Sequence, residues 1–95
     1  YCDPAHKALL DTLRDELRFV CITSYARVHD LTAAPADCVD TALPGLRLKV
    51  TPSAHAKCIR CWHHRADVGA HKEHAQLCGR CVTNVAGAGE SRSFA

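Results

Sequence analysis

The 95-residue sequence predicts an α+β fold: an amphipathic helix on a small antiparallel two-stranded sheet, followed by a ribbon built on four cysteines. Three observations support this prediction. Apolar residues recur at helical spacing near the start, alternate with polar residues over 46–51, and are followed by two Cys-x-x-Cys pairs. We therefore expect a helix and sheet subdomain over residues 1–52 and a cysteine module with a C-terminal tail over residues 53–95.

The helix is expected to begin at Asp3-Pro4. Asp3 can cap the first free amides, and Pro4 has a helical φ at a position where no N–H is needed. Helical spacing then defines an apolar stripe of Leu10, Leu13, Leu17 and Val20. The opposite face should be solvated, with charges that can pair three residues apart: Asp11, Arg14, Asp15 and Arg18.

The sheet is expected to follow the helix directly. Residues 22–28 are rich in β-branched side chains and predict a first strand. Residues 30–44 contain Pro35 and Pro44, with Gly45 directly after them, and predict a loop. In residues 46–51, apolar and polar side chains alternate, which indicates a second strand with one face packed on the helix.

The two Cys-x-x-Cys pairs, Cys58/Cys61 and Cys78/Cys81, are separated by sixteen residues. That spacing is typical of two tight turns that present four thiolates to one tetrahedral metal ion, and zinc is the ion such sites prefer. Four sulfur ligands leave no position open for water. We therefore predict one structural Zn²⁺, which makes the ribbon a four-cysteine zinc ribbon.

These cysteines could have other uses. Two disulfides, or simple burial, fit the paired spacing less well. A site of three cysteines and one histidine would use His74 or His63. The remaining cysteines, Cys2, Cys21 and Cys38, have no regular spacing and suit a reducing compartment.

Charge divides the chain unevenly. Residues 1–46 carry four Lys/Arg against seven Asp/Glu, a balance of −3, and residues 47–95 carry eight against three, a balance of +5. A zinc ion with four thiolates lowers the second balance to about +3, a modest field that favours contacts with phosphate. The nucleic-acid-binding candidates in this half are Lys57, Arg60, Trp62, Arg65, Lys72 and Arg80. Such cations are most often merely solvated, and a lone tryptophan beside a zinc turn is more often part of its core.

Several function classes find no support in the sequence. No nucleophile with a nearby base and no phosphate loop occurs, so we expect no catalytic residues here. No apolar run is long enough for a membrane span, and the start lacks a signal peptide pattern, so we expect a soluble, cytoplasmic chain with no membrane partner. The chain begins with Tyr1 and has no methionine, from which we expect it to be part of a longer protein.

The cysteine module resembles the C-terminal zinc-binding region of bacterial isoleucyl-tRNA synthetases. The matching residues are Lys57-Cys58-x-Arg60-Cys61-Trp62, Val68-Gly69, His74, Leu77-Cys78-x-Arg80-Cys81, Asn84, Gly87-x-Gly89-Glu90-x-Arg92 and Phe94-Ala95. Residues 15–20 and 22–24 resemble the region before that module, though less specifically. The resemblance implies zinc ligands at Cys58, Cys61, Cys78 and Cys81.

The same resemblance implies a function. It makes this chain a tRNA-contacting appendage that supports tRNA(Ile) binding for aminoacylation in a monomeric parent isoleucine–tRNA ligase, with the bond-making residues elsewhere. An alternative is the zinc-finger DNA-binding module of a formamidopyrimidine-DNA glycosylase-like repair protein, whose cysteine spacing is similar. The preceding helix and strands and the Gly-x-Gly-Glu-x-Arg tail argue against that alternative.

Overall fold

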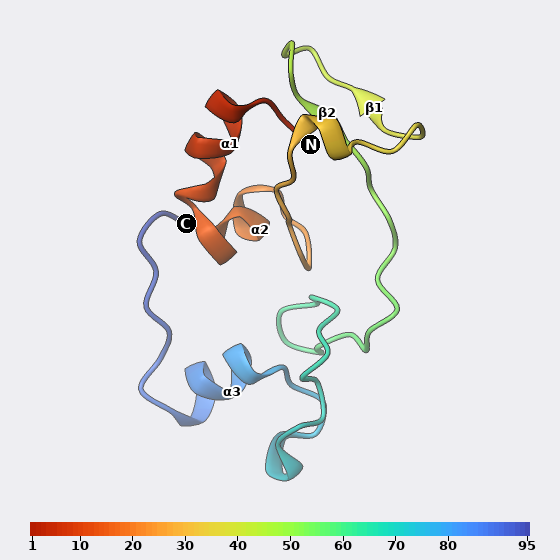
Figure 1. Cartoon of the computed structure of the whole chain (residues 1–95). Helices are drawn as coiled ribbons and strands as arrows, with labels where there is room; N and C mark the ends of the chain where they lie inside the picture. Colours follow the sequence, from red (N-terminus) through yellow and green to blue (C-terminus); the bar gives the residue numbers. More distant parts are fainter. The chain divides into compact units, whose positions relative to one another are not determined.

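A computed structural model describes residues 1–95, which divide into two compact units (Figure 1). The first unit comprises Tyr1–Pro52 with Phe94, and the second comprises Ser53–Ser93 with Ala95. Helices and a two-stranded antiparallel sheet form the first unit, and the second is built around four clustered cysteines. The predicted α+β fold with a four-cysteine zinc ribbon is confirmed.

Helix α1 spans Pro4–Asp11 and begins where the sequence predicts. The Asp3 carboxylate accepts a hydrogen bond from the His6 backbone N–H at 2.9 Å, and Pro4 occupies the first turn. The helix ends early because the Thr12 hydroxyl donates to the Leu9 carbonyl at 2.6 Å, a local bond that competes with helix continuation. Arg14 then adopts a φ of +51°, in the left-handed region, which interrupts the right-handed backbone at this point.

After this break the chain forms a 3₁₀ turn, η1 at Arg14–Glu16, and a short helix, α2 at Leu17–Val20. Leu17 is buried as the apolar stripe predicts, whereas Val20 is 57 % exposed. Arg18 was expected on the solvated face, and this is wrong, since it is only 5 % exposed. Its Nε donates to Asp15 at 2.8 Å, the predicted three-residue spacing, and its guanidinium covers the Phe19 ring at 4.2 Å.

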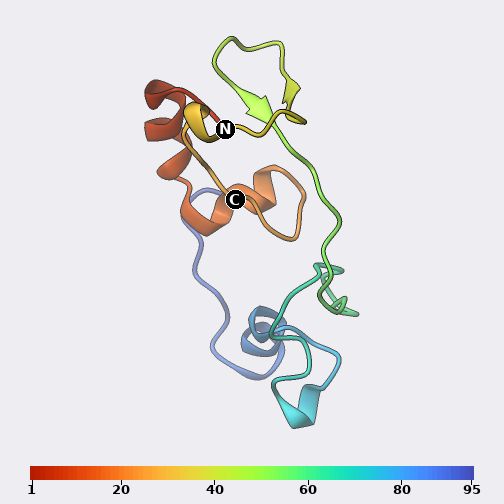
Figure 2. The same cartoon turned by 45° about the vertical axis from the view of Figure 1, so that its right-hand side comes forward.

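The sheet pairs β1, Val39–Asp40, with β2, Arg47–Leu48, in antiparallel register (Figure 2). The second strand lies within the predicted region, but the first comes from residues predicted as a loop. Arg47 explains the pairing in part, because it donates to the Asp40 carboxylate at 2.8 Å and to the Cys38 carbonyl at 3.0 Å. Side-chain bonds of this kind span the turn and cannot be read from local strand propensity.

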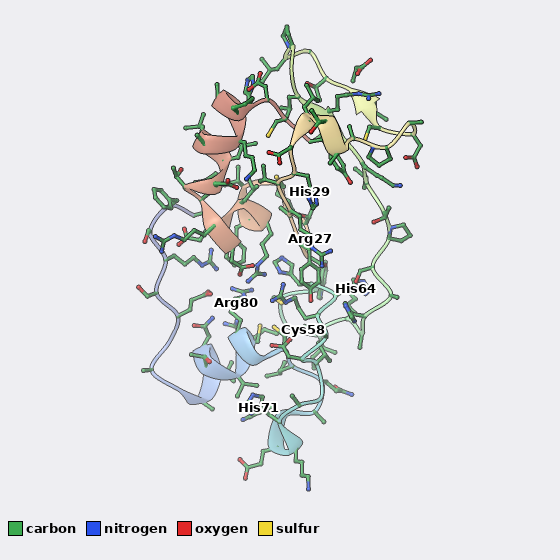
Figure 3. All side chains as sticks on the ribbon, viewed as in Figure 1. Arg27, His29, Cys58, His64, His71 and Arg80 are labelled. Carbon is green, nitrogen blue, oxygen red and sulfur yellow. The ribbon has the colours of Figure 1, made fainter.

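Residues 22–28 form no strand, so the strand predicted there is wrong. Ile22 has a φ of +54° and is 89 % exposed, which is incompatible with a pleated, half-buried strand. Aromatic side chains in and after this segment make other contacts. The Arg27 guanidinium lies over the Tyr25 ring at 5.8 Å, and His29 stacks on Tyr1 at 5.0 Å (Figure 3).

The chain start completes the first unit by pairing with two distant segments. Cys2 forms bridges with Asp30 and Leu46, and the Tyr1 amino group and carbonyl exchange hydrogen bonds with Arg47 at 2.9 and 2.8 Å. Cys2 is 1 % exposed and therefore lies at the centre of this small core. Backbone pairing, with little apolar burial, holds the unit together.

Gly45 is the position where this arrangement is most sensitive to substitution. Its φ is +77°, and a Cβ there would overlap the Asp3 carboxylate that caps α1. Gly45→Ala should therefore lower the free energy of unfolding by about 1–3 kcal/mol, measured by urea denaturation followed by circular dichroism. Ala42→Ser, an exposed change in the same turn, should have no comparable effect. Equal stability of the two variants would show that Gly45 is not needed.

Candidate metal centre

The first cysteine pair lies in a tight turn between two short antiparallel segments. Lys57 forms a bridge with His64, and the Cys58 N–H donates to the His63 carbonyl at 2.9 Å. The Trp62 N–H closes the turn by donating to the Cys58 carbonyl at 2.9 Å, with Trp62 at a φ of +66°. This turn directs the two sulfurs of the pair to one side.

The second cysteine pair opens helix α3, Gly79–Ala86. Cys78 is the N-cap residue and Cys81 lies in the first turn, so both sulfurs lie near the partial positive charge of the helix N-terminus. The Gly79 N–H donates to the Asp67 carboxylate at 3.0 Å, and a Cβ at residue 79 would come within 2.7 Å of that carboxylate. Asp67 therefore caps α3, a role that sequence analysis missed because the cap lies twelve residues before its partner.

The fold brings the four sulfurs of Cys58, Cys61, Cys78 and Cys81 together, all within 4.8 Å of one another. The Cys61 and Cys78 sulfurs are 3.7 Å apart, and the edge of a tetrahedron with zinc–sulfur bonds of about 2.3 Å is about 3.8 Å. All four are free thiols, and all but Cys61 are fully buried. This donor set fits one structural Zn²⁺ with a closed coordination shell.

Contacts between the two cysteine pairs hold the cluster together. The Cys78 N–H donates to the Cys58 sulfur at 3.4 Å, and the Ile59 N–H donates to the Gln76 carbonyl at 3.1 Å. Val68 and Leu77 pack against the cysteines from outside. A 3₁₀ turn, η3 at Lys72–His74, precedes Cys78.

No histidine nitrogen belongs to the cluster, so His63 and His74, the alternative ligands, are not part of the group that the fold assembles. Of the other histidines, His64 places its Nδ1 2.8 Å from the His55 carbonyl oxygen. His71 precedes η3, and Figure 3 shows its side chain away from the sulfurs near Cys58. The geometry therefore supports a metal site with four sulfur ligands.

The thiols differ in how readily they ionise. Burial raises the pKa of Cys78 to about 12 and also raises the pKa of Cys81. Burial acts in the same direction on Cys58, but hydrogen bonds from backbone amides outweigh it and lower its pKa to about 6. Cys58 thus ionises more readily than Cys78 and Cys81, from which metal binding must displace protons.

The C-terminal tail docks on α3 through Glu90. Its carboxylate accepts hydrogen bonds from Arg80 at 2.7 Å, Arg92 at 2.8 Å and Asn84 at 3.1 Å, and its N–H donates to the Asn84 side chain at 2.8 Å. Glu90 is therefore held in place although Gly87 and Gly89 precede it. Burial opposes ionisation of Glu90, but these hydrogen bonds outweigh it and lower its pKa to about 2.

The six predicted nucleic-acid candidates differ in exposure. Trp62 is 69 % exposed. The more common role of such a tryptophan, as part of the module's core, therefore does not apply to it. The Lys57 amine lies over its ring at 4.8 Å. The other exposed candidates are Arg60 and Lys72, and the half-buried ones are Arg65 and Arg80.

Comparison with known proteins links this centre to a family. A family model described as "Zinc finger found in FPG and IleRS" matches residues 57–84. Over the whole chain, isoleucine–tRNA ligases are similar: 58 % identity in Thioalkalivibrio sulfidiphilus, 57 % in Pseudomonas paraeruginosa, and 54 % over 99 % of the chain in Methylococcus capsulatus. The chain spans about 10 % of the length of these curated relatives. No solved structure matches it, and no helix is long and apolar enough to cross a membrane.

Zinc should account for the order of the second unit. Elemental analysis should find about one zinc per chain, and removal by a chelator should abolish the circular dichroism signal of α3, because metal binding contributes about 10–16 kcal/mol in finger peptides. Cys61→Ser should release the metal, whereas Cys21→Ser, at an exposed cysteine outside the cluster, should retain it. A reduced chain that keeps α3 without zinc would contradict a structural role.

Glu90→Gln should lower the free energy of unfolding by about 1–3 kcal/mol at pH 7, since the lost charge accepts several hydrogen bonds. The pKa of Glu90 falls from 4.5 to about 2 on folding, so this stabilisation is full above pH 4.5 and lost as the pH falls through about 2. Urea unfolding should therefore show a difference between variant and parent that shrinks below pH 4.5. Glu73→Gln, an exposed change on η3, is the control, and an equal effect there would exclude a specific role for Glu90.

Proposed function

Since the chain belongs to the family of zinc-finger regions found in isoleucine–tRNA ligases, we propose that it is the zinc-stabilised, tRNA-contacting part of such a ligase. Its role is to help hold tRNA(Ile) in position for aminoacylation. The observation that best supports this role is the exposed Trp62 side chain on the zinc-fixed turn, with Lys57 over its ring. A rigid aromatic side chain paired with a cation suits stacking on an unpaired base beside a phosphate.

The turn supports the proposal because it holds the tryptophan in place. Trp62 closes the first cysteine turn with its own N–H, and its left-handed φ limits the directions that the side chain can take. A side chain fixed in this way loses little conformational entropy when a base stacks on it. An exposed indole of this kind contributes nothing to the module's core, so another use for it is expected.

The cations of the second unit would supply phosphate contacts around this residue. The proposed set is Lys57, Arg60, Arg65, Lys72 and Arg80. Arg80 is the weakest member, because its side chain is only 18 % exposed and pairs with Glu90. The net charge of about +3 with zinc bound predicts moderate, salt-dependent attraction and not tight independent binding.

The proposal assigns the chain to binding and not to bond making. The four-sulfur zinc site leaves no open position for water or substrate, so zinc acts as a structural ion. Activation of isoleucine by ATP would belong to other parts of the ligase, and productive placement of tRNA would be the contribution made here. A cytoplasmic location, where free thiols such as Cys21 persist, and a monomeric state complete the proposal.

A DNA-repair role is the second candidate, because the matching family model names FPG as well as IleRS. That model covers only residues 57–84, whereas the similarity to isoleucine–tRNA ligases extends over the whole chain. The two candidates differ in ligand. Binding of duplex DNA by this chain at physiological salt, without preference for tRNA(Ile), would favour the repair role.

Trp62→Ala in the ligase that carries this chain should raise the KM for tRNA(Ile) about 10-fold, since base stacking contributes about 1–3 kcal/mol. Trp62→Phe should retain most of the function. Isoleucine-dependent exchange of pyrophosphate into ATP should be unchanged, because that reaction does not need tRNA.

Ile59→Ala is the matched control, since Ile59 is an apolar residue of the same turn and is 60 % exposed. Zinc content measured for each variant separates loss of the fold from loss of a contact. An unchanged KM in a zinc-loaded Trp62→Ala enzyme would refute stacking on this residue.

A further inference from the structure

The two cysteine pairs share an arginine at the same position. The sequences are Cys58-Ile59-Arg60-Cys61 and Cys78-Gly79-Arg80-Cys81. Each arginine precedes a cysteine of its own pair but donates to the other pair. Arg60 Nη1 donates to the Cys81 sulfur at 3.6 Å, and the Arg80 guanidinium donates to the Cys61 sulfur. The two contacts are reciprocal, because each links one turn to the corresponding cysteine of the opposite turn.

We propose that Arg60 and Arg80 are positioning residues of the zinc centre that neutralise its charge and orient Cys81 and Cys61. Four thiolates and one Zn²⁺ carry a net charge of −2, and two guanidinium groups bring the sum to zero. A nearly buried cluster with no net charge avoids the cost of an uncompensated charge in a low-dielectric environment. Donation to sulfur also fixes the direction in which each cysteine side chain faces the metal.

The surroundings of Arg80 support this role. Glu90 accepts from Arg80 at 2.7 Å and from Arg92 at 2.8 Å, so the carboxylate is itself shared between two arginines. Adding Arg92 and Glu90 to the sum leaves it at zero, since their charges cancel. Asn84 donates to the same carboxylate oxygen at 3.1 Å. The docked tail therefore holds Arg80 against the centre without withdrawing its charge.

Lysine cannot replace these arginines fully. Guanidinium offers several N–H donors in a fixed plane, so one group can bond a sulfur and a carboxylate at the same time. Arg80 makes this double contact with Cys61 and Glu90. An ammonium group would retain the charge and lose the geometry. Net charge and directed donation are therefore two separate effects, and substitutions can test each of them.

The test compares zinc affinity in four variants of the 95-residue chain by competition with a chelator of known affinity. Arg60→Gln and Arg80→Gln should each weaken zinc binding about 10-fold or more, the effect typical of residues that orient metal ligands. Lys72→Gln removes the same charge from an exposed residue of η3 and should change the affinity less than twofold. Arg80→Lys should lie between Arg80→Gln and the parent chain. Zinc should be quantified directly, since the exposed Cys21 would confuse assays based on thiol consumption.

A second readout separates donation to sulfur from general stabilisation of the fold. In the chain loaded with Co²⁺ in place of Zn²⁺, the sulfur-to-metal charge-transfer bands should move to lower energy in Arg60→Gln and Arg80→Gln, because an undonated thiolate is easier to oxidise. A merely structural role would not shift these bands in variants that still bind the metal. If a glutamine variant fails to fold, the same bands and affinities are measured for Arg60→Lys and Arg80→Lys, which should show smaller shifts in the same direction.

Three results would overturn the proposal. The first is unchanged zinc affinity and unshifted cobalt bands in folded arginine variants. The second is an equal loss of zinc affinity in Lys72→Gln, which would show that the arginine variants act only through the overall charge of the chain. The third applies if the glutamine variants do not fold. In that case, lysine variants with the zinc affinity and cobalt bands of the parent chain would overturn the proposal, since directed donation requires the guanidinium group.

Discussion

Four cysteine sulfurs held within 4.8 Å of one another repel each other as thiolates unless a cation lies among them. The second unit depends on this constraint, because its fully buried residues are all cysteines of the cluster, with Val68 and Leu77 only partly buried beside them. A hydrophobic core of this size contributes little to stability. The metal therefore takes the place of a core, and the turn, the helix and the tail are organised around it.

Local sequence signals predicted the elements that are specified locally. Cys-x-x-Cys spacing and the Asp3-Pro4 start act over a few residues, and both appear where expected. The first strand was misplaced because a two-residue strand at Val39 exists only through its distant partner at Leu48. Arg18 was assigned to solvent because helical periodicity assumes a continuous helix, and the left-handed Arg14 breaks that continuity.

The candidate site also combines locally specified features with features that depend on distant partners. Its ligands follow from spacing, whereas the residues that support them act across the chain. Asp67 caps α3 from twelve residues away, and Glu90 returns to Asn84 and Arg80 from beyond the helix. The shared Cys-x-Arg-Cys pattern was visible in the sequence, but donation from each arginine to the opposite pair arises only when both turns converge. Trp62 likewise has a left-handed φ and an exposed side chain, and neither is specified by the local sequence alone.

Cys78 is both a sulfur of the cluster and the N-cap of α3, and the same helix presents Asn84 and Arg80 to the tail. The metal and the tail therefore both stabilise one helix, which on its own is too short to be stable in water. Thermodynamic linkage makes their effects reciprocal. If bound zinc favours docking of the tail by a given factor, the docked tail raises the zinc affinity by the same factor. A partner that engages Glu90 or Arg92 would thus change zinc affinity without touching a sulfur.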